Sequence, residues 1–145
     1  MFMGEYKHTI DSKNRLFMPV RFRMRTKNKK VMKYVVTRGL DGCLYVYMPE
    51  EWRQLSEKFK SLPIKNKIAE RAFKRALLSG ASEVQLDAQG RILIPTHLTQ
   101  FAGITGDVII IGVMDHAEIW SKKRWIEYKK YADKSFKQLA PQLEI

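Results

Sequence analysis

Hydrophobic and polar positions follow two alternating patterns along the chain. Short apolar and β-branched runs, typical of strands, give way to stretches with an apolar residue at every third or fourth position, typical of helices. The strand pattern predicts strands over residues 5–10, 15–18, 33–38, 43–48, 81–86, 91–94, 107–113 and 117–120. Together with the helices, these strands indicate an α+β fold with a mostly β core and flanking helices.

Helices are expected between these strands. Pro19 and Pro95 each open a short helix, because proline suits the first helical position. The first covers residues 19–25 and is followed by a basic loop at 26–30. Longer helices are predicted from Pro49 to the break at Leu62, over 65–78 with Gly80 as the end, and from about Ser121 to 139. The last helix carries its apolar residues on one face, namely Trp125, Tyr128, Ala132, Phe136 and Leu139.

A ten-residue motif opens each half of the pattern. Ile10–Pro19 and Leu86–Pro95 lie 76 residues apart, and each has an apolar residue, Asp-x-x-x-Arg, three apolar residues and Pro. Farther along, Trp52 aligns with Trp125 at an offset of 73, so the first half has three extra residues near its lysine-rich loop. The chain is therefore an internal duplication. Half-units of about 45 residues rarely bury a core alone, so we expect the halves to interleave their strands.

Each motif predicts a tight hairpin. Its last loop residue is Asn14 in the first copy and Gly90 in the second, the two residue types that best tolerate positive φ. The Asp would accept hydrogen bonds from backbone N–H groups of its own turn, and the Arg would open the return strand within reach of that carboxylate.

Two interpretations of the Asp–Arg pairs stay open. Asp11 with Arg15 and Asp87 with Arg91 can each fix the register of a hairpin end, and survival of the second pair in a half without net charge favours this interpretation. An exposed ion pair contributes at most about 1 kcal/mol, so register would be its main role. Arg15 can also serve recognition, because a guanidinium already held by Asp11 is well placed for a phosphate or a guanine edge.

Charge is distributed unevenly between the halves. The formal net charge is +12, with 19 Lys and Arg against 7 Asp and Glu in residues 1–76 and 8 of each in residues 77–145. Ordinary surfaces mix the two signs, whereas a one-sided density attracts a polyanion such as nucleic acid or an anionic membrane.

The candidate DNA-binding residues surround the first motif: Lys7, Lys13, Arg15, Arg21, Arg23 and Arg25. Arg21 and Arg25 would share one face of the short helix, with Phe22 turned inward. Most of these positions hold no basic residue in the second copy, among them Glu83, Gln89, His97 and Thr99. We therefore expect the first motif to face DNA and the second half to serve protein–protein contacts; a merely solvated basic face is the alternative.

No enzyme signature accompanies this charge. His8, His97 and His116 lack metal-ligand spacing, and the chain has no Gly-rich phosphate loop, His-Glu-x-x-His or Gly-x-Ser-x-Gly motif. Cys43 is the single cysteine and suits a small core position. No run approaches about 18 apolar residues, and the start lacks the shape of a signal peptide. We expect a cytoplasmic protein with no metal, cofactor, membrane or small-molecule substrate.

Four features together resemble one protein family. They are the duplicated Asp-x-x-x-Arg motif, Met-Phe-Met-Gly-Glu-Tyr at 1–6, Thr-Arg-Gly-Leu-Asp-Gly-Cys-Leu at 37–44, and Ile-Gly-Val at 111–113 followed by Glu-Ile-Trp at 118–120. In this order they resemble the bacterial MraZ family over about residues 1–139. Asn14 stands where the family motif often has Gly.

The resemblance implies two pseudo-symmetric repeats of the SpoVT/AbrB-like swapped-hairpin group, forming one intertwined barrel-like unit. The expected division is a basic, DNA-facing repeat at 5–47, a helical connector at 48–80, a second repeat at 81–124 and a C-terminal helix at 121–139. It further implies a nucleoid-associated transcriptional regulator of the division and cell-wall gene cluster, which assembles as a ring and binds short direct repeats upstream of its own operon.

The sequence thus predicts a sequence-specific, double-stranded DNA-binding regulator rather than an enzyme. The hairpin tip and short helix of the first copy would approach the major groove, and a ring would add avidity over repeated sites. The alternative is a non-specific nucleic-acid-binding or assembly scaffold protein, which would not hold repeat DNA against an excess of random duplex.

Overall fold

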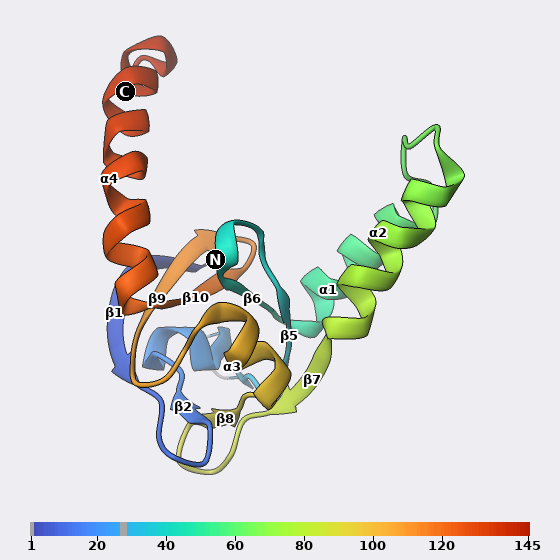
Figure 1. Cartoon of the computed structure of the whole chain (residues 1–145). Helices are drawn as coiled ribbons and strands as arrows, with labels where there is room; N and C mark the ends of the chain where they lie inside the picture. Colours follow the sequence, from blue (N-terminus) through green and yellow to red (C-terminus); the bar gives the residue numbers. More distant parts are fainter. Residues whose placement is uncertain (1, 27–28) are drawn as a thin grey trace.

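A computed structural model describes residues 2–26 and 29–145, without the side chains of residues 25, 26, 29 and 30 (Figure 1). The strands of the first half are β1 (Phe2–Thr9), β2 (Arg15–Phe17), β3 (Met24–Thr26), β4 (Lys29–Lys30), β5 (Lys33–Arg38) and β6 (Leu44–Tyr47). Those of the second half are β7 (Ser82–Gln85), β8 (Arg91–Leu93), β9 (Asp107–Met114) and β10 (Ala117–Ser121). The helices are α1 (Pro49–Phe59), α2 (Lys67–Gly80), α3 (Thr96–Ala102) and α4 (Lys122–Leu139), with 3-10 turns η1 (Val20–Arg23), η2 (Leu40–Gly42) and η3 (Ala140–Leu143). The predicted α+β class is confirmed.

Strands from both halves share one six-stranded antiparallel sheet. Its order is β1-β9-β10-β6-β5-β7, so each half contributes three strands. The order is pseudo-symmetric about the β10–β6 pair, because β1 and β7, β9 and β5, and β10 and β6 are counterparts in the duplication. The sheet is open, with β1 and β7 as its edges, so its pairing does not confirm the expected barrel-like unit.

The two Asp-x-x-x-Arg segments form turns but not the simple hairpins that the sequence predicts. β1 pairs with β9, and β2 pairs with β8, so the strands flanking the first turn find their partners in the other half. In the same way β7, which precedes the second turn, pairs with β5. This exchange lets each half cover apolar residues that a half-unit cannot bury alone.

The segment after Pro19 also differs from its prediction. Only Val20–Arg23 are helical, as a 3-10 turn, and Met24 begins strand β3, which pairs with β4. Tyr34 donates its hydroxyl to the carbonyl of Phe22 at 2.7 Å, and Val31 donates its N–H to the carbonyl of Arg23 at 2.7 Å. These donors occupy the acceptors that a continuing helix would use. Only the last two residues of the helix expected over 19–25, and part of the basic loop expected at 26–30, are therefore strand. Residues 27 and 28 of that loop lie outside the described chain.

The two faces of the sheet are covered differently. One large buried cluster draws on both halves, including Phe22, on which the rings of Phe2 and Tyr6 pack edge-on at 4.7 and 5.2 Å. A smaller cluster contains Cys43 and Trp120 and lies beneath the start of α4. Burial raises the pKa of the Cys43 thiol, as befits the core residue that the sequence predicts.

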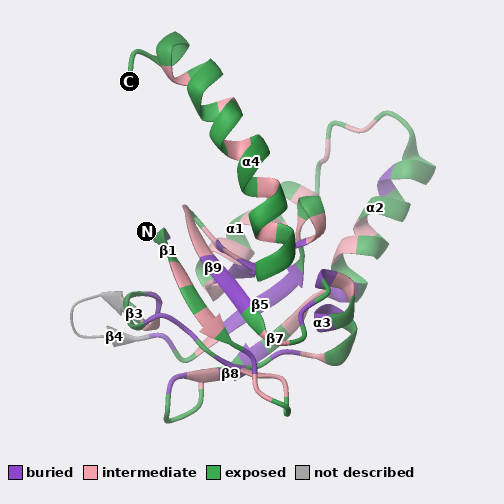
Figure 2. Cartoon of the chain, turned by 60° about the vertical axis from the view of Figure 1, so that its left-hand side comes forward, coloured by how far each residue is buried: buried purple, intermediate pink, exposed green. Residues whose placement is uncertain are grey.

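Two helical arms project away from the end of the molecule that carries the Asp-x-x-x-Arg turns (Figures 1 and 2). One arm is α1 with α2, and the other is α4. Asn66 caps α2 by accepting the backbone N–H of Ile68 and Ala69, and Ser121 caps α4 by accepting that of Arg124. Most residues of both arms are exposed or intermediate (Figure 2). Within the described residues, no helix combines the length and apolarity needed to cross a bilayer.

Candidate nucleic-acid interface

The two Asp-x-x-x-Arg turns meet at a two-stranded ribbon of β2 and β8 (Figure 1). The ribbon is antiparallel, with Leu16 opposite Ile92 at its centre. Because side chains alternate along a strand, these two central residues point inward, and both are buried. The residues on either side form an outward surface, here called the ribbon face: Arg15, Phe17, Arg91 and Leu93.

Asp11 organises the first turn with both carboxylate oxygens. Its Oδ1 accepts the backbone N–H of Lys13 and of Arg15, each at 2.9 Å. Its Oδ2 accepts Nε of Arg15 at 2.7 Å. These bonds, led by that from the Arg15 backbone, lower the pKa of Asp11 and favour its charged form.

The second turn repeats this geometry. Asp87 Oδ1 accepts the backbone N–H of Gln89 and of Arg91 at 2.9 Å, and Oδ2 accepts Nε of Arg91 at 2.9 Å. The Arg91 backbone N–H is again the first cause of a lowered pKa at Asp87. The left-handed residues predicted at the end of each turn are confirmed, with φ of 60° at Asn14 and 89° at Gly90.

Each turn is tied to the strand that leaves the other turn. Met18 donates its N–H to the carbonyl of Gly90 at 3.0 Å, and Ile94 donates its N–H to that of Asn14 at 2.9 Å. Asn14 also donates its side-chain amide to the hydroxyl of Thr96 at 3.3 Å. The ribbon and its turns are therefore a single unit that neither half can build alone.

The ribbon face presents two guanidinium groups with donors to spare. Each uses its Nε for its own aspartate, and within the described chain the terminal Nη atoms of Arg15 and Arg91 have no hydrogen-bond partner. The side chains are 34% and 21% exposed, respectively. The two arginines are diagonal neighbours across the ribbon, a relation that places Cα atoms about 7–8 Å apart. Cζ of Arg91 lies 5.7 Å from the ring centre of Phe17, which with Leu93 adds exposed apolar area.

The other predicted DNA-binding residues lie in different settings. Lys13 is exposed in the first turn, and Arg21 is exposed on η1. Arg25 lies on β3, so it does not share a helix face with Arg21 as predicted, and its side chain is outside the described part. Lys7 is on edge strand β1, where it lines a small hollow beside the start of α4 rather than joining the ribbon face.

Arg23 braces the second turn. Its Nε donates to the carbonyl of Met18 at 2.7 Å, and its guanidinium covers Gly90 so closely that a Cβ there would overlap it. Burial first, and then the charge of Arg23, lowers the pKa of His8. This arginine, predicted as a DNA contact, is thus partly committed inside the protein.

Sequence reasoning missed that Arg15 and Arg91 share one face and that Phe17 and Leu93 lie beside them. The sequence carried a signal for this arrangement. In both motifs the arginine is followed by a buried residue, an outward apolar residue and a second buried residue. The pairing itself depends on strand exchange, which one motif does not reveal.

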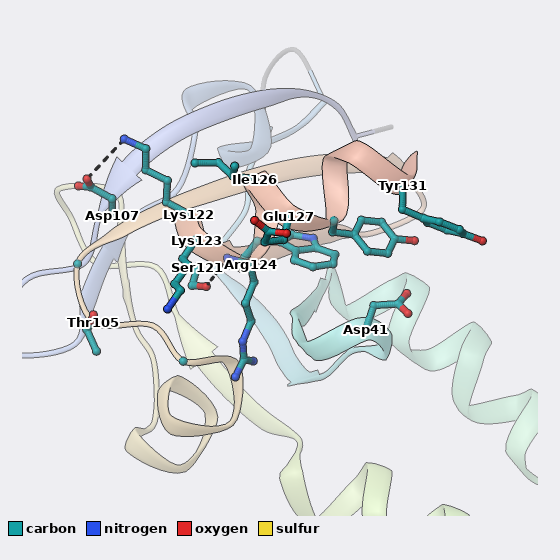
Figure 3. A pocket seen from close by; sticks show the side chains of 14 residues that line it. Asp41, Thr105, Asp107, Ser121, Lys122, Lys123, Arg124, Ile126, Glu127 and Tyr131 are labelled. Atoms are coloured by element: carbon teal, nitrogen blue, oxygen red, sulfur yellow. Dashed lines mark hydrogen bonds and ion pairs between the residues drawn. The ribbon is translucent and has the colours of Figure 1, made fainter. Parts of the chain in front are cut away.

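A groove of about 1080 Å³ opens at the base of α4 (Figure 3). Its walls include Tyr128 and Tyr131, and Arg124 reaches from α4 to the opposite side (Figure 3). Nη1 of Arg124 donates to the carbonyls of Gly42 and Phe101 at 2.9 and 3.0 Å. Among the described residues, no three His, Cys, Asp or Glu side chains are grouped to hold a metal ion. That the protein uses no cofactor stays a prediction.

These features define a class: a two-repeat protein whose repeats share strands and present paired Asp-x-x-x-Arg turns on one surface. The family model described as "MraZ protein, putative antitoxin-like" matches residues 1–76 and again residues 77–143. The chain belongs to the MraZ family, as its motifs predict.

Its relatives match over nearly their whole length. Proteins named "Transcriptional regulator MraZ" are 51% identical in Caldanaerobacter subterraneus subsp. tengcongensis, over 99% of this chain and 97% of that protein, and 50% identical in Heliobacterium modesticaldum, over 99% and 96%. The protein of that name in Clostridium beijerinckii is 52% identical over 90% of this chain and 88% of its own.

Proposed function

We propose that this protein is a sequence-specific, double-stranded DNA-binding transcriptional regulator and not an enzyme. The ribbon face carries the proposal, because Arg15 and Arg91 are each held by an aspartate and keep their terminal donors unpaired among the described residues. The relatives' printed name supports regulation of transcription. From the family resemblance, its targets are short direct repeats upstream of its own operon in the division and cell-wall gene cluster, so it acts in the cytoplasm at the nucleoid.

The ribbon face suits the major groove. A two-stranded β-ribbon fits this groove, which is about 12 Å wide in B-DNA. An arginine fork matches a phosphate or the O6/N7 edge of guanine, and apolar side chains such as Phe17 and Leu93 match the thymine methyl group. Lys13 and Arg21 add phosphate contacts beside the first turn, which keeps the first repeat the more strongly DNA-facing half.

A ring-shaped homo-oligomer multiplies this surface. Phe136 and Leu139 on α4 are 65% and 52% exposed, and Ile68 on α2 is 72% exposed. Such apolar area on two projecting arms favours burial against further copies of the chain. Several weakly binding ribbon faces, tethered together, gain avidity where DNA repeats match their spacing.

We retain the division into repeats at 5–47 and 81–124, a connector at 48–80 and a C-terminal helix at 121–139, with one change. The DNA surface draws on both repeats, because β2 and β8 build it together. The exchange of β1 and β7 between the halves supports placement in the SpoVT/AbrB-like swapped-hairpin group.

The proposal is tested by competition. The protein is bound to the duplex from directly upstream of its own gene and challenged with random duplex. Specific complexes are typically favoured by about 10³-fold or more, so we expect the upstream duplex to stay bound against a hundredfold excess. Release in proportion to the competitor would favour the non-specific nucleic-acid-binding or scaffold function instead.

A further inference from the structure

The second half has no net charge, but its basic and acidic residues are concentrated in different segments. Of its 8 Lys and Arg, 7 lie between Lys122 and Leu139, with only Glu127 and Asp133 as acids in that helix. The projecting arm α4 is therefore strongly basic, whereas the rest of the second half is acidic.

Lysines of α4 form a stripe along the side of the helix opposite Trp125, Tyr128, Ala132, Phe136 and Leu139. At about 100° per residue, four of them fall within one narrow sector. These four, here called the lysine stripe, are Lys123, Lys130, Lys134 and Lys137. All four are exposed, and within the described residues only Lys130 has an ion pair, with Glu127 at 3.4 Å. The stripe extends for about 21 Å at about 1.5 Å per residue, the rise of about six base pairs at about 3.4 Å each.

The base of α4 is anchored on the body, so that Lys130, Lys134 and Lys137 lie on the projecting part of the helix while Lys123 lines the groove at its base. Trp125 and Tyr128 pack on Trp120 with ring centres 5.5 and 4.8 Å apart, and Trp125 donates its indole N–H to Glu5 at 3.0 Å. The helix then projects from the end of the molecule opposite the ribbon (Figures 1 and 2). Assembly through the apolar side of α4 would leave the lysine stripe uncovered.

We propose that the lysine stripe is a second DNA-binding surface, which holds the phosphate backbone of a duplex without regard to sequence. Ammonium groups are point charges that suit phosphates rather than base edges. Because the stripe and the ribbon face lie at opposite ends, one assembly joins two duplex segments. The joining of two duplexes rests on the proposed function, since the ribbon face holds the first duplex. Sequence-independent binding by the lysine stripe does not depend on that function.

A duplex fits the stripe better than a lipid surface does. A helix that binds a bilayer buries its apolar side at the boundary of the acyl chains. In α4 the base of that side is already covered by Trp120 and the body. The lysines of the stripe, in contrast, are all exposed, over several turns of the helix.

The test is a bridging assay with the full-length protein. Upstream duplex is fixed to beads, protein is added, and capture of a fluorescent random duplex from solution is measured. The test variant is Lys130→Gln/Lys134→Gln/Lys137→Gln. The control variant, Lys58→Gln/Lys60→Gln/Lys65→Gln, removes the same charge from exposed positions around α1. It also breaks one ion pair, as the test variant does, because Lys60 pairs with Glu57 at 3.1 Å and Lys130 pairs with Glu127.

We expect the test variant to capture about tenfold less random duplex, with a salt slope for that capture shallower by about 2 to 3, while it binds the bead-held duplex as the wild type does. The control should bridge normally. Circular dichroism and light scattering establish that both variants fold and assemble as the wild type does.

Two results would overturn the inference. Unchanged bridging by the test variant would show that the ribbon faces of one ring hold both duplexes. Unchanged bridging with lost binding to phosphatidylserine vesicles would make the ligand a membrane. If bridging falls although the upstream duplex is not preferred over random duplex, the proposed sequence specificity fails but the second surface stands.

Discussion

At the residue scale, Gly90 of the second half lies in contact with Arg23 of the first half. It combines a positive φ of 89° with the Arg23 guanidinium where a Cβ would lie. Both features are absent at Gly106, where an added Cβ would meet nothing within 4 Å. The two glycines therefore form a matched pair of substitution sites.

We expect Gly90→Ala to lower the free energy of unfolding by about 1–3 kcal/mol, because it adds backbone strain and displaces Arg23. Gly106→Ala should stay within about 0.5 kcal/mol of the wild type. Urea denaturation measures both values. Equal stability of the two variants would mean that Arg23 does not brace the second turn.

The paired aspartates predict a pH dependence of stability. The folded-state pKa of Asp11 and of Asp87 is lowered, first by the backbone N–H of Arg15 and Arg91. Their contribution is therefore present above the unfolded pKa of about 3.9 and is lost as the pH falls through the lower folded value. Denaturation curves between neutral pH and pH 3 should show a smaller decline for Asp11→Asn/Asp87→Asn than for the wild type. An identical decline would assign acid sensitivity to other carboxylates.

At the element scale, local patterns predicted most boundaries but not the partners. The turns, the left-handed Asn14 and Gly90, and the Asp–Arg pairs follow from the motif, because their hydrogen bonds close within five residues. The short helix opened by Pro19 ends at Arg23 rather than at residue 25, because Tyr34 and Val31 occupy the carbonyls that its continuation needed. The ribbon could not be predicted from one motif, because β2 pairs with β8 across the duplication.

Arg124 anchors the α4 arm, and its loss should loosen that element selectively. Its two bonds to the carbonyls of Gly42 and Phe101 join α4 to the body. We expect Arg124→Gln to cost about 1–2 kcal/mol and to speed hydrogen exchange in α4 while leaving β2 and β8 protected. Lys123→Gln is the matched control, because the neighbouring Lys123 makes no such bond among the described residues. It should have little effect. Faster exchange throughout the molecule would contradict a local anchor.

At the scale of the whole molecule, the proposed function depends on assembly of several copies of the chain. A monomer has a mass of 17.0 kDa, and its arms carry apolar side chains that are largely exposed, such as Ile68 and Phe136. Phe136→Ser/Leu139→Ser should reduce the particle toward that mass in light scattering, because it removes apolar area from α4. Met32→Ser/Leu40→Ser, which alters residues 73% and 70% exposed elsewhere, should leave assembly intact. A wild-type particle of monomer mass at micromolar concentration would refute the ring.

The proposed DNA surface is built by both repeats. Titration of the upstream duplex with Arg15→Ala, Arg91→Ala and Arg71→Ala, after light scattering shows that each is assembled, tests this directly. A well-formed charge-assisted contact is worth roughly 1.5–3 kcal/mol, so Arg15→Ala should weaken binding about tenfold or more.

The decisive variant in that titration is Arg91→Ala, which alters the half that carries few charges around its motif. The shared ribbon face predicts that it also weakens binding several-fold, whereas Arg71→Ala, which removes the same charge from exposed α2, does not. Wild-type affinity in an assembled Arg91→Ala protein would show that the first repeat binds DNA alone and would contradict a DNA surface shared by both repeats.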